Sequence, residues 1–142
     1  MFEVRVEAKA FDPGAEHARL AALAPRVGAV VLFTGQVRDE PLVLEHWPGV
    51  AERWIERRLA AARGRWPLLG AILVHRFGPL AVGAPIVLVA TAAAHRADAF
   101  AAAEYLMDFL KSEAPFWKRR PDGRWVEPRA EDKRARMRWE TA

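Results

Sequence analysis

The segment LKSEAPFWKRR, residues 110–120, holds the side chains best suited to chemistry. Lysine and arginine together number 22 in this chain, only four of them are lysines, and two of these four, Lys111 and Lys118, lie seven residues apart here. A desolvated ammonium group can lose its proton and act as a nucleophile, acid or base, whereas a guanidinium group stays charged. The pair predicts a site that uses amine chemistry or binds an anion, although two ordinary solvated lysines would give the same pattern.

The residues around Lys118 read as a strand that follows a helix ended by Pro115. Side chains alternate along a strand, so Phe116 shares a face with Lys118, and Trp117 lies on the other face. One aromatic ring can then fill the core while Lys118 emerges on a cleft wall. This placement favours a functional lysine over a solvated one.

Two further groups of residues are candidates for binding an anion. His95 and Arg96 stand where a strand gives way to a long helix, and the first turn of a helix attracts anions through its unpaired N–H groups. A surface pair between Arg96 and Asp98 is an equally good reading. Gly35 allows a ligand to approach the backbone closely, and Arg38 follows it at a strand end, but a tight hairpin with a solvated arginine would look the same.

Charge and composition narrow the classes of function. The net charge is +4, and residues 111–138 hold ten Lys or Arg against five Asp or Glu, so this segment carries +5 and the remainder −1. A local basic excess indicates an anionic partner. The chain has no cysteine, which excludes disulfides, zinc–thiolate sites and a cysteine nucleophile or persulfide. His46 and His75 lie among apolar strand residues and read as structural histidines, and we expect no metal and no other cofactor.

The elements that must position these residues follow from periodicity and turn signals. Residues 2–9 alternate between apolar and charged side chains, as a half-buried strand does and a signal peptide does not. The strands predicted over 28–38 and 42–46 are close enough in sequence to form a hairpin. The other predictions are helices over 13–24, 50–63, 97–111 and 131–139, strands over 71–75 and 85–91, and a hairpin of 116–119 with 124–127. Together they predict one α+β domain, residues 1–142, with a largely antiparallel sheet.

Seven motifs in order resemble the large, catalytic subunit of molybdopterin synthase, over residues 2–139. They are VLFTGQVRD, LEHWPGVAE, RWPL, VHRFG, AAAHRADAF, MDFLKSEAPFWKR and GRWVE. The resemblance implies an α/β hammerhead-like fold and a cytoplasmic homodimer at the core of a heterotetramer, without a membrane or nucleic-acid partner. It implies an enzyme that transfers two sulfur atoms to cyclic pyranopterin monophosphate. The sulfur comes from the thiocarboxylated Gly-Gly C-terminus of a small ubiquitin-like carrier subunit.

The resemblance also implies which residues act. The catalytic lysines fall on Lys111 and Lys118. The substrate-binding positions fall on Gln36, Val37, Arg38, His95, Arg96, Arg119, Arg120 and Arg129. The chain departs from the family in a shortened loop after Arg38 and in Arg120, which stands where an acid is common.

One geometric inference comes from the long helix alone. Arg96 and Lys111 stand at its two ends, about 22 Å apart at 1.5 Å per residue, too far for one small pterin to contact both. We therefore expect a composite site, in which His95 and Arg96 come from the other subunit of the dimer. The alternative function is a non-catalytic module that grips single-stranded nucleic acid with basic residues and with Trp117, Trp125 and Trp139.

Overall fold

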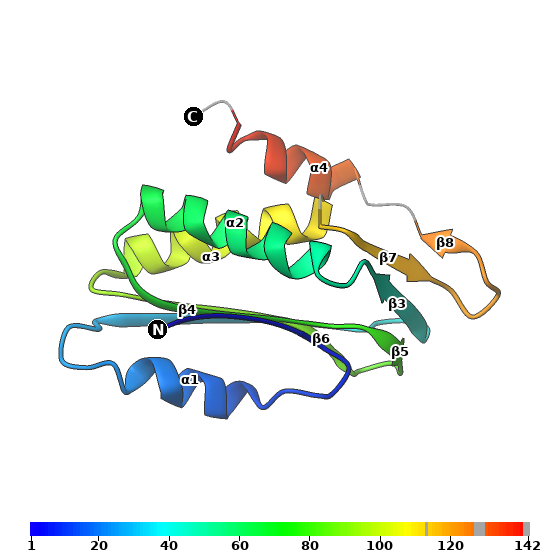
Figure 1. The fold of residues 1–142 in the computed structure, drawn as a ribbon, viewed down its shortest axis with the longest axis horizontal. Coiled ribbons are helices and arrows are strands. Elements are labelled where there is room, and N and C mark those ends of the chain that lie inside the picture. The colour runs from blue at the N-terminus through cyan, green and yellow to red at the C-terminus, as the bar shows by residue number, and fades with distance from the viewer. Residues whose placement is uncertain (113, 127–129, 141–142) are drawn as a thin grey trace.

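The structure is a computed structural model that describes residues 1–112, 114–126 and 130–140. Its elements follow the order β-α-β-β-α-β-β-β-α-β-β-α, and Figure 1 shows how they are layered. The elements are β1 (Phe2–Glu7), α1 (Pro13–Ala21), β2 (Ala29–Gln36), β3 (Leu42–His46), α2 (Val50–Arg65), β4 (Leu68–Arg76), β5 (Gly78–Leu80), β6 (Pro85–Ala93), α3 (Arg96–Ser112), β7 (Phe116–Arg119), β8 (Trp125–Val126) and α4 (Ala130–Met137). Among the described residues, no helix is long and apolar enough to cross a membrane.

The central sheet has the strand order β1-β4-β6-β2, with β1 and β4 parallel and the other pairs antiparallel. Helix α1 covers one face, and α2 and α3 cover the other, with α4 outside them (Figure 1). Alternate residues of one strand therefore enter different cores: Leu73 packs on the side of α2 and α3, whereas Ile72 and Val74 pack on the side of α1. Coverage of both faces explains why β4 and β6 are apolar almost without interruption.

The second sheet has the order β5-β3-β7-β8 and lies at one end of the molecule (Figure 1). The predicted hairpin of residues 28–38 with 42–46 is wrong, because β2 pairs with β6 and β3 pairs with β5 and β7. After β2 the chain stays bound to the region before β6, since the N–H of Val37 donates to the oxygen of Ala84. Asp39 then adopts a φ of 70° and the chain leaves the central sheet. The predicted C-terminal hairpin is confirmed by the pairing of β7 with β8.

The helices begin where the sequence predicts, and two details differ. Asp12 caps α1 by accepting a hydrogen bond from the N–H of Ala15, as expected for an Asp-Pro start. The prediction that α2 ends before Gly64 is wrong, because the helix continues to Arg65. By residue type Phe100 fits an apolar stripe of this helix with Met107 and Leu110, but it is 62% exposed, because the small residues Ala99, Ala102 and Ala103 form the buried face.

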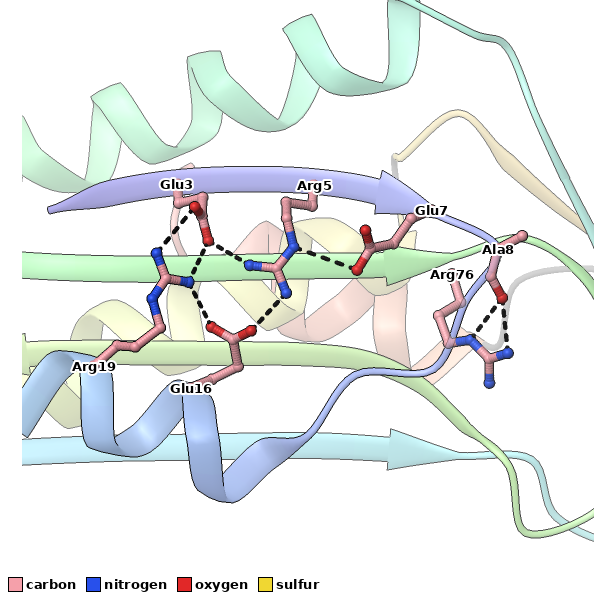
Figure 2. Close-up of polar contacts among 7 residues, drawn as sticks. All are labelled: Glu3, Arg5, Glu7, Ala8, Glu16, Arg19 and Arg76. Carbon is pink, nitrogen blue, oxygen red and sulfur yellow. Dashed lines mark hydrogen bonds and ion pairs between the residues drawn. The ribbon is translucent and has the colours of Figure 1, made fainter.

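A network of charged side chains joins β1 to α1 on the outer side of the central sheet (Figure 2). Arg5 donates to Glu16 at 2.6 Å, to Glu7 at 3.3 Å and to Glu3. Arg19 bonds Glu3 at 2.7 Å and Glu16 at 2.9 Å. The carboxylate of Glu16 is nearly buried and accepts hydrogen bonds from both arginines, so it is paired rather than isolated in the core. The pKa of Glu3 is lowered, chiefly by its hydrogen bond to Arg19.

We predict that Arg5→Met lowers the free energy of unfolding by about 2 kcal/mol, because the variant keeps the aliphatic stem and leaves three carboxylates with one arginine. Urea unfolding at pH 7 measures this change. The matched control is Arg26→Met, which removes an exposed guanidinium group outside the network. Equal stabilities of the two variants would contradict a stabilising role for the network.

Candidate functional site

The two lysines of the opening segment come from different elements. Lys111 lies in the last turn of α3, where an ammonium group is favourable next to the negative end of the helix dipole. Lys118 lies in β7, paired with Leu44 of β3 and with Val126 of β8. Lys111 is exposed and Lys118 is half-buried. The short connection from α3 to β7 brings both onto the same end of the molecule.

Both lysines act electrostatically on one buried side chain, His75, at the end of β4. The pKa of His75 is lowered to about 4, first by burial, although its hydrogen bond to the carbonyl oxygen of Arg76 opposes the shift. The positive charges of Lys111 and Lys118 and the ring of His46 lower it further. The charges of both lysines therefore act on the same imidazole.

A cluster of four rings joins the two sheets at the position of Phe116, two residues before Lys118. His75 of β4 stacks on Phe116 of β7, with centroids 3.7 Å apart and planes 13° apart. His46 of β3 lies 6.0 Å from Phe116 and 4.3 Å from Phe77. The predicted alternation along β7 is confirmed, since Phe116 packs against the core and Trp117 is exposed. The aromatic residue on the face of Lys118 is therefore the packed one.

Sequence reasoning classed His75 as a structural histidine and did not connect it with the lysines. The structure confirms that it is satisfied locally, because its Nδ1 lies 2.8 Å from the oxygen of Arg76. One feature of the sequence points to His75. It stands in the motif VHRFG, at the end of an apolar strand, in a chain that has only four histidines. Its stacking partner lies some forty residues later in the sequence, which no local pattern predicts.

The lowered pKa of His75 predicts how stability depends on pH. Above pH 6.5 the ring is neutral in both the folded and the unfolded chain, and as the pH falls from 6.5 to about 4 only the unfolded chain takes up the proton. The free energy of unfolding should therefore fall across this window, by at most about 3 kcal/mol at its lower end. We predict that His75→Phe removes this part of the pH dependence, measured by urea unfolding between pH 7 and pH 5.

Replacement of an exposed histidine serves as the control for that experiment. His17→Gln, on α1, removes an exposed imidazole and shows what the loss of a histidine as such does to the profile. The groups that face the imidazole come from three elements, namely Lys111 of α3, Lys118 of β7 and His46 of β3. Parallel pH profiles for His75→Phe and the parent chain would contradict the assignment of this slope to His75.

His95 and Arg96 stand at the opposite end of α3 from Lys111. Arg96 is the first residue of the helix, and both side chains are exposed. The carbonyl oxygen of His95 accepts the N–H of Ala99 at 3.3 Å. The helix spacing puts Arg96 about 22 Å from Lys111. Within one chain, the structure does not bring His95 and Arg96 together with the two lysines.

The strand-end candidates Gln36, Val37 and Arg38 differ in what they offer. Gln36 is exposed and donates to the oxygen of Gly83 at 3.4 Å. Val37 is buried, and its N–H and carbonyl oxygen are bonded to Ala84 and Gly83. Arg38 extends into solvent, 3.9 Å from Asp39. Of these three residues, Arg38 alone carries a positive charge, and in the chain by itself that charge is exposed.

The arginines after Lys118 pair with acids of the β3 region. Arg119 lies 3.2 Å from Glu45, on the face of the second sheet opposite to Lys118, and it lies over the ring of Trp125 at 5.8 Å. Arg120 lies 3.7 Å from Glu40, in the loop before β3. Both pairs are exposed, so each costs little to break when a ligand binds. Arg129 lies outside the described residues.

The expected tryptophan platform for nucleic acid is incomplete. Trp117 and Trp125 are exposed on the second sheet. Trp139 instead packs edge-on against Trp66 and Tyr105, and its Nε1 donates to Asp108 at 2.7 Å. Two exposed rings remain, with Arg119 between them. This arrangement weakens the nucleic-acid interpretation.

The chemistry available around His75 is that of two amines beside a neutral imidazole. Such a site can bind a carboxylate or thiocarboxylate and can move protons. Among residues 1–112, 114–126 and 130–140, no group of three His, Cys, Asp or Glu side chains could hold a metal ion.

Comparisons with known proteins agree on one family. A family model described as MoaE protein matches residues 6–113. The chain is 49% identical over 144 residues to a molybdopterin synthase catalytic subunit of Cereibacter sphaeroides, covering 96% of this chain and 99% of the relative. It is 47% identical over 146 residues to a catalytic subunit of the same name from Ralstonia nicotianae, covering 96% and 83%. A solved molybdopterin biosynthesis MoaE protein from Burkholderia ambifaria superposes with a TM-score of 0.87 at 47% identity, covering 99% of both chains, which confirms the expected fold.

Proposed function

The chain belongs to the MoaE protein family, and on this premise we propose that it is the catalytic subunit of a molybdopterin synthase, an enzyme of molybdenum cofactor biosynthesis. Its substrate is cyclic pyranopterin monophosphate, which receives two sulfur atoms and becomes the dithiolene molybdopterin. The sulfur is delivered by the thiocarboxylated C-terminus of a small ubiquitin-like carrier subunit. We place the reaction in the cytoplasm.

The observation that carries this proposal is that Lys111, at the end of α3, and Lys118, in β7, both act electrostatically on the imidazole of His75. Two ammonium groups from different elements form a basic slot suited to a charged thiocarboxylate. The chain has no cysteine, so it cannot hold the transferred sulfur as a persulfide. A partner that brings the sulfur already activated is what this combination requires.

The phosphate of the pterin needs a second group of cations. His95 and Arg96, at the N-terminus of α3, offer an imidazole, a guanidinium group and helix N–H groups for it, with Arg38 as a further cation. Because Lys111 is about 22 Å away along the same helix, one chain cannot apply both groups to one pterin. We propose that the enzyme is a dimer whose two sites each take Lys111 and Lys118 from one subunit and His95 and Arg96 from the other.

The remaining site residues have supporting roles in this proposal. Gln36 and Arg38 border the substrate, and Val37 fixes the backbone between them. Arg119, Arg120 and Arg129 supply positive charge around the entry of the carrier tail. Arg119 and Arg120 pair with Glu45 and Glu40 at exposed positions. Breaking these ion pairs to bind the ligand instead costs little free energy.

Reconstitution tests the proposed function. The purified chain is mixed with a thiocarboxylated carrier and cyclic pyranopterin monophosphate, and the dithiolene product is followed by its oxidised fluorescent derivative. The proposal expects product formation that depends on the thiocarboxylate. The matched control is the same carrier with an ordinary carboxylate terminus. Absence of product with a carrier shown to bind the chain would contradict the proposal.

A further inference from the structure

His75 is a buried ring whose position is fixed from three sides. Its residue is 8% exposed, its Nδ1 lies 2.8 Å from the carbonyl oxygen of Arg76, and its plane stacks on Phe116. A carbonyl oxygen only accepts hydrogen bonds, so Nδ1 carries the hydrogen and Nε2 of the neutral ring carries none. The ring therefore has one orientation and one tautomer.

The residue that holds His75 is itself held firmly. The guanidinium group of Arg76 donates to the oxygen of Ala8 at 2.8 Å and 3.1 Å (Figure 2), and to the oxygen of Pro85 at 3.0 Å. Arg76 thus ties the end of β4 to the chain after β1 and to the start of β6. The carbonyl oxygen that orients His75 belongs to a fixed part of the central sheet.

The stack transfers this fixed position to the strand that carries Lys118. Phe116 and Lys118 lie on one face of β7, two residues apart, and β7 belongs to the second sheet. Lys111 is attached to the central sheet through α3, which packs on β6 and β2. The contact of His75 with Phe116 is therefore a direct link between the bodies that carry the two lysines. A flat ring gives that link a defined spacing, which an aliphatic side chain does not.

We propose that His75 is a positioning residue for sulfur transfer: its neutral ring, stacked on Phe116, sets where Lys118 stands relative to Lys111. The inference rests on the proposed function, because it concerns the geometry of the same two lysines. The neutral state of the His75 ring matters as well, because a protonated ring would add a third positive charge to those of the two ammonium groups. The groups that act on the ring are Lys111, Lys118 and His46.

Two variants separate the ring from its hydrogen bond. His75→Phe keeps a flat neutral ring and loses the donor to Arg76, whereas His75→Asn keeps a donor and loses the ring. If the ring positions Lys118, His75→Phe keeps kcat within about threefold of the parent chain, and His75→Asn lowers kcat by about 10- to 100-fold, as misplacement by about 1 Å does. Both values are corrected for the folded fraction measured by circular dichroism.

Each other outcome overturns the proposal. Equal and near-normal kcat values, after that correction, would make His75 a structural residue only. Loss of activity in both variants would make an imidazole nitrogen the essential group. A second readout needs no activity: the ¹³C signal of reductively methylated Lys118 should move in His75→Asn and stay in place in His75→Phe. Lys118→Arg, which lacks the signal, assigns it. An inactive parent chain would refute the proposed function and leave this spectroscopic result standing.

Discussion

Lys118→Ala is expected to lower kcat for molybdopterin formation by about 10²- to 10⁴-fold, the range that the loss of a positioned acid or base produces. The side chain emerges from β7 beside the stacked rings of Phe116 and His75, so alanine removes the amine without disturbing the stack. The folded structure should therefore survive. Single-turnover assays with the thiocarboxylated carrier measure the rate, and circular dichroism measures the fold.

The matched controls are the two lysines outside the site. Lys9 and Lys133 are exposed, so Lys9→Ala and Lys133→Ala remove the same charge from the chain without touching the region of His75. Both should keep the parent rate. A Lys118→Ala chain that is folded and as active as these controls would remove the central assignment of the site.

Mixing two inactive variants is expected to restore activity. In a heterodimer of Lys111→Ala with His95→Ala, a composite arrangement leaves one site with both alanines and the other with both native residues. Such a heterodimer should have about half of the parent activity, since one of two equivalent sites is intact. If each site used Lys111 and His95 of the same subunit, both sites would lack one residue and the heterodimer would stay inactive.

The heterodimer must be isolated for this result to be decisive. Two different affinity tags, one on each variant, allow purification of mixed dimers in two steps. The control is a tagged Lys111→Ala homodimer carried through the same mixing, which should remain inactive. No rescue in verified heterodimers would contradict the shared site and would require another explanation for the separation of Arg96 from Lys111 along α3.

Local sequence patterns predicted those parts of the fold whose cause is local. The alternation over residues 2–9 predicted β1, which ends at Glu7, and its charged face, and the pair Asp12–Pro13 is a local signal for the start of α1. Local patterns do not predict which other elements β1 and α1 contact. That Arg5 and Arg19 would both bond Glu16 depends on how α1 lies across the sheet, and sequence spacing does not specify that.

The wrong predictions also concern contacts between elements that are distant in sequence. Residues 42–46 are near β2 in sequence, but they pair with β7, about seventy residues later. Closeness in sequence therefore predicted the wrong partner strand. Phe100 fits an apolar helical stripe by type, whereas the close packing of α3 on the sheet selects alanines for that face. Residue type alone does not tell how closely a helix packs on the sheet.

The candidate site also has a part that the sequence predicts and a part that only the structure reveals. Residue chemistry and family resemblance selected Lys111 and Lys118, and the alternation of β7 placed Phe116 on the face of Lys118. The common neighbour of the lysines, His75, comes from β4 and required the packing of two sheets to be known. Its environment lowers the pKa of this ordinary-looking histidine to about 4.

The central claim, that the two amines together receive the sulfur-bearing tail, is tested most directly by a crystal structure of the chain bound to its carrier. The account predicts that the carrier's terminal carboxylate or thiocarboxylate lies within about 4 Å of the Nζ atoms of Lys111 and Lys118, the range of an ion pair. A tail that ends on another surface, with both amines in contact with solvent alone, would contradict it.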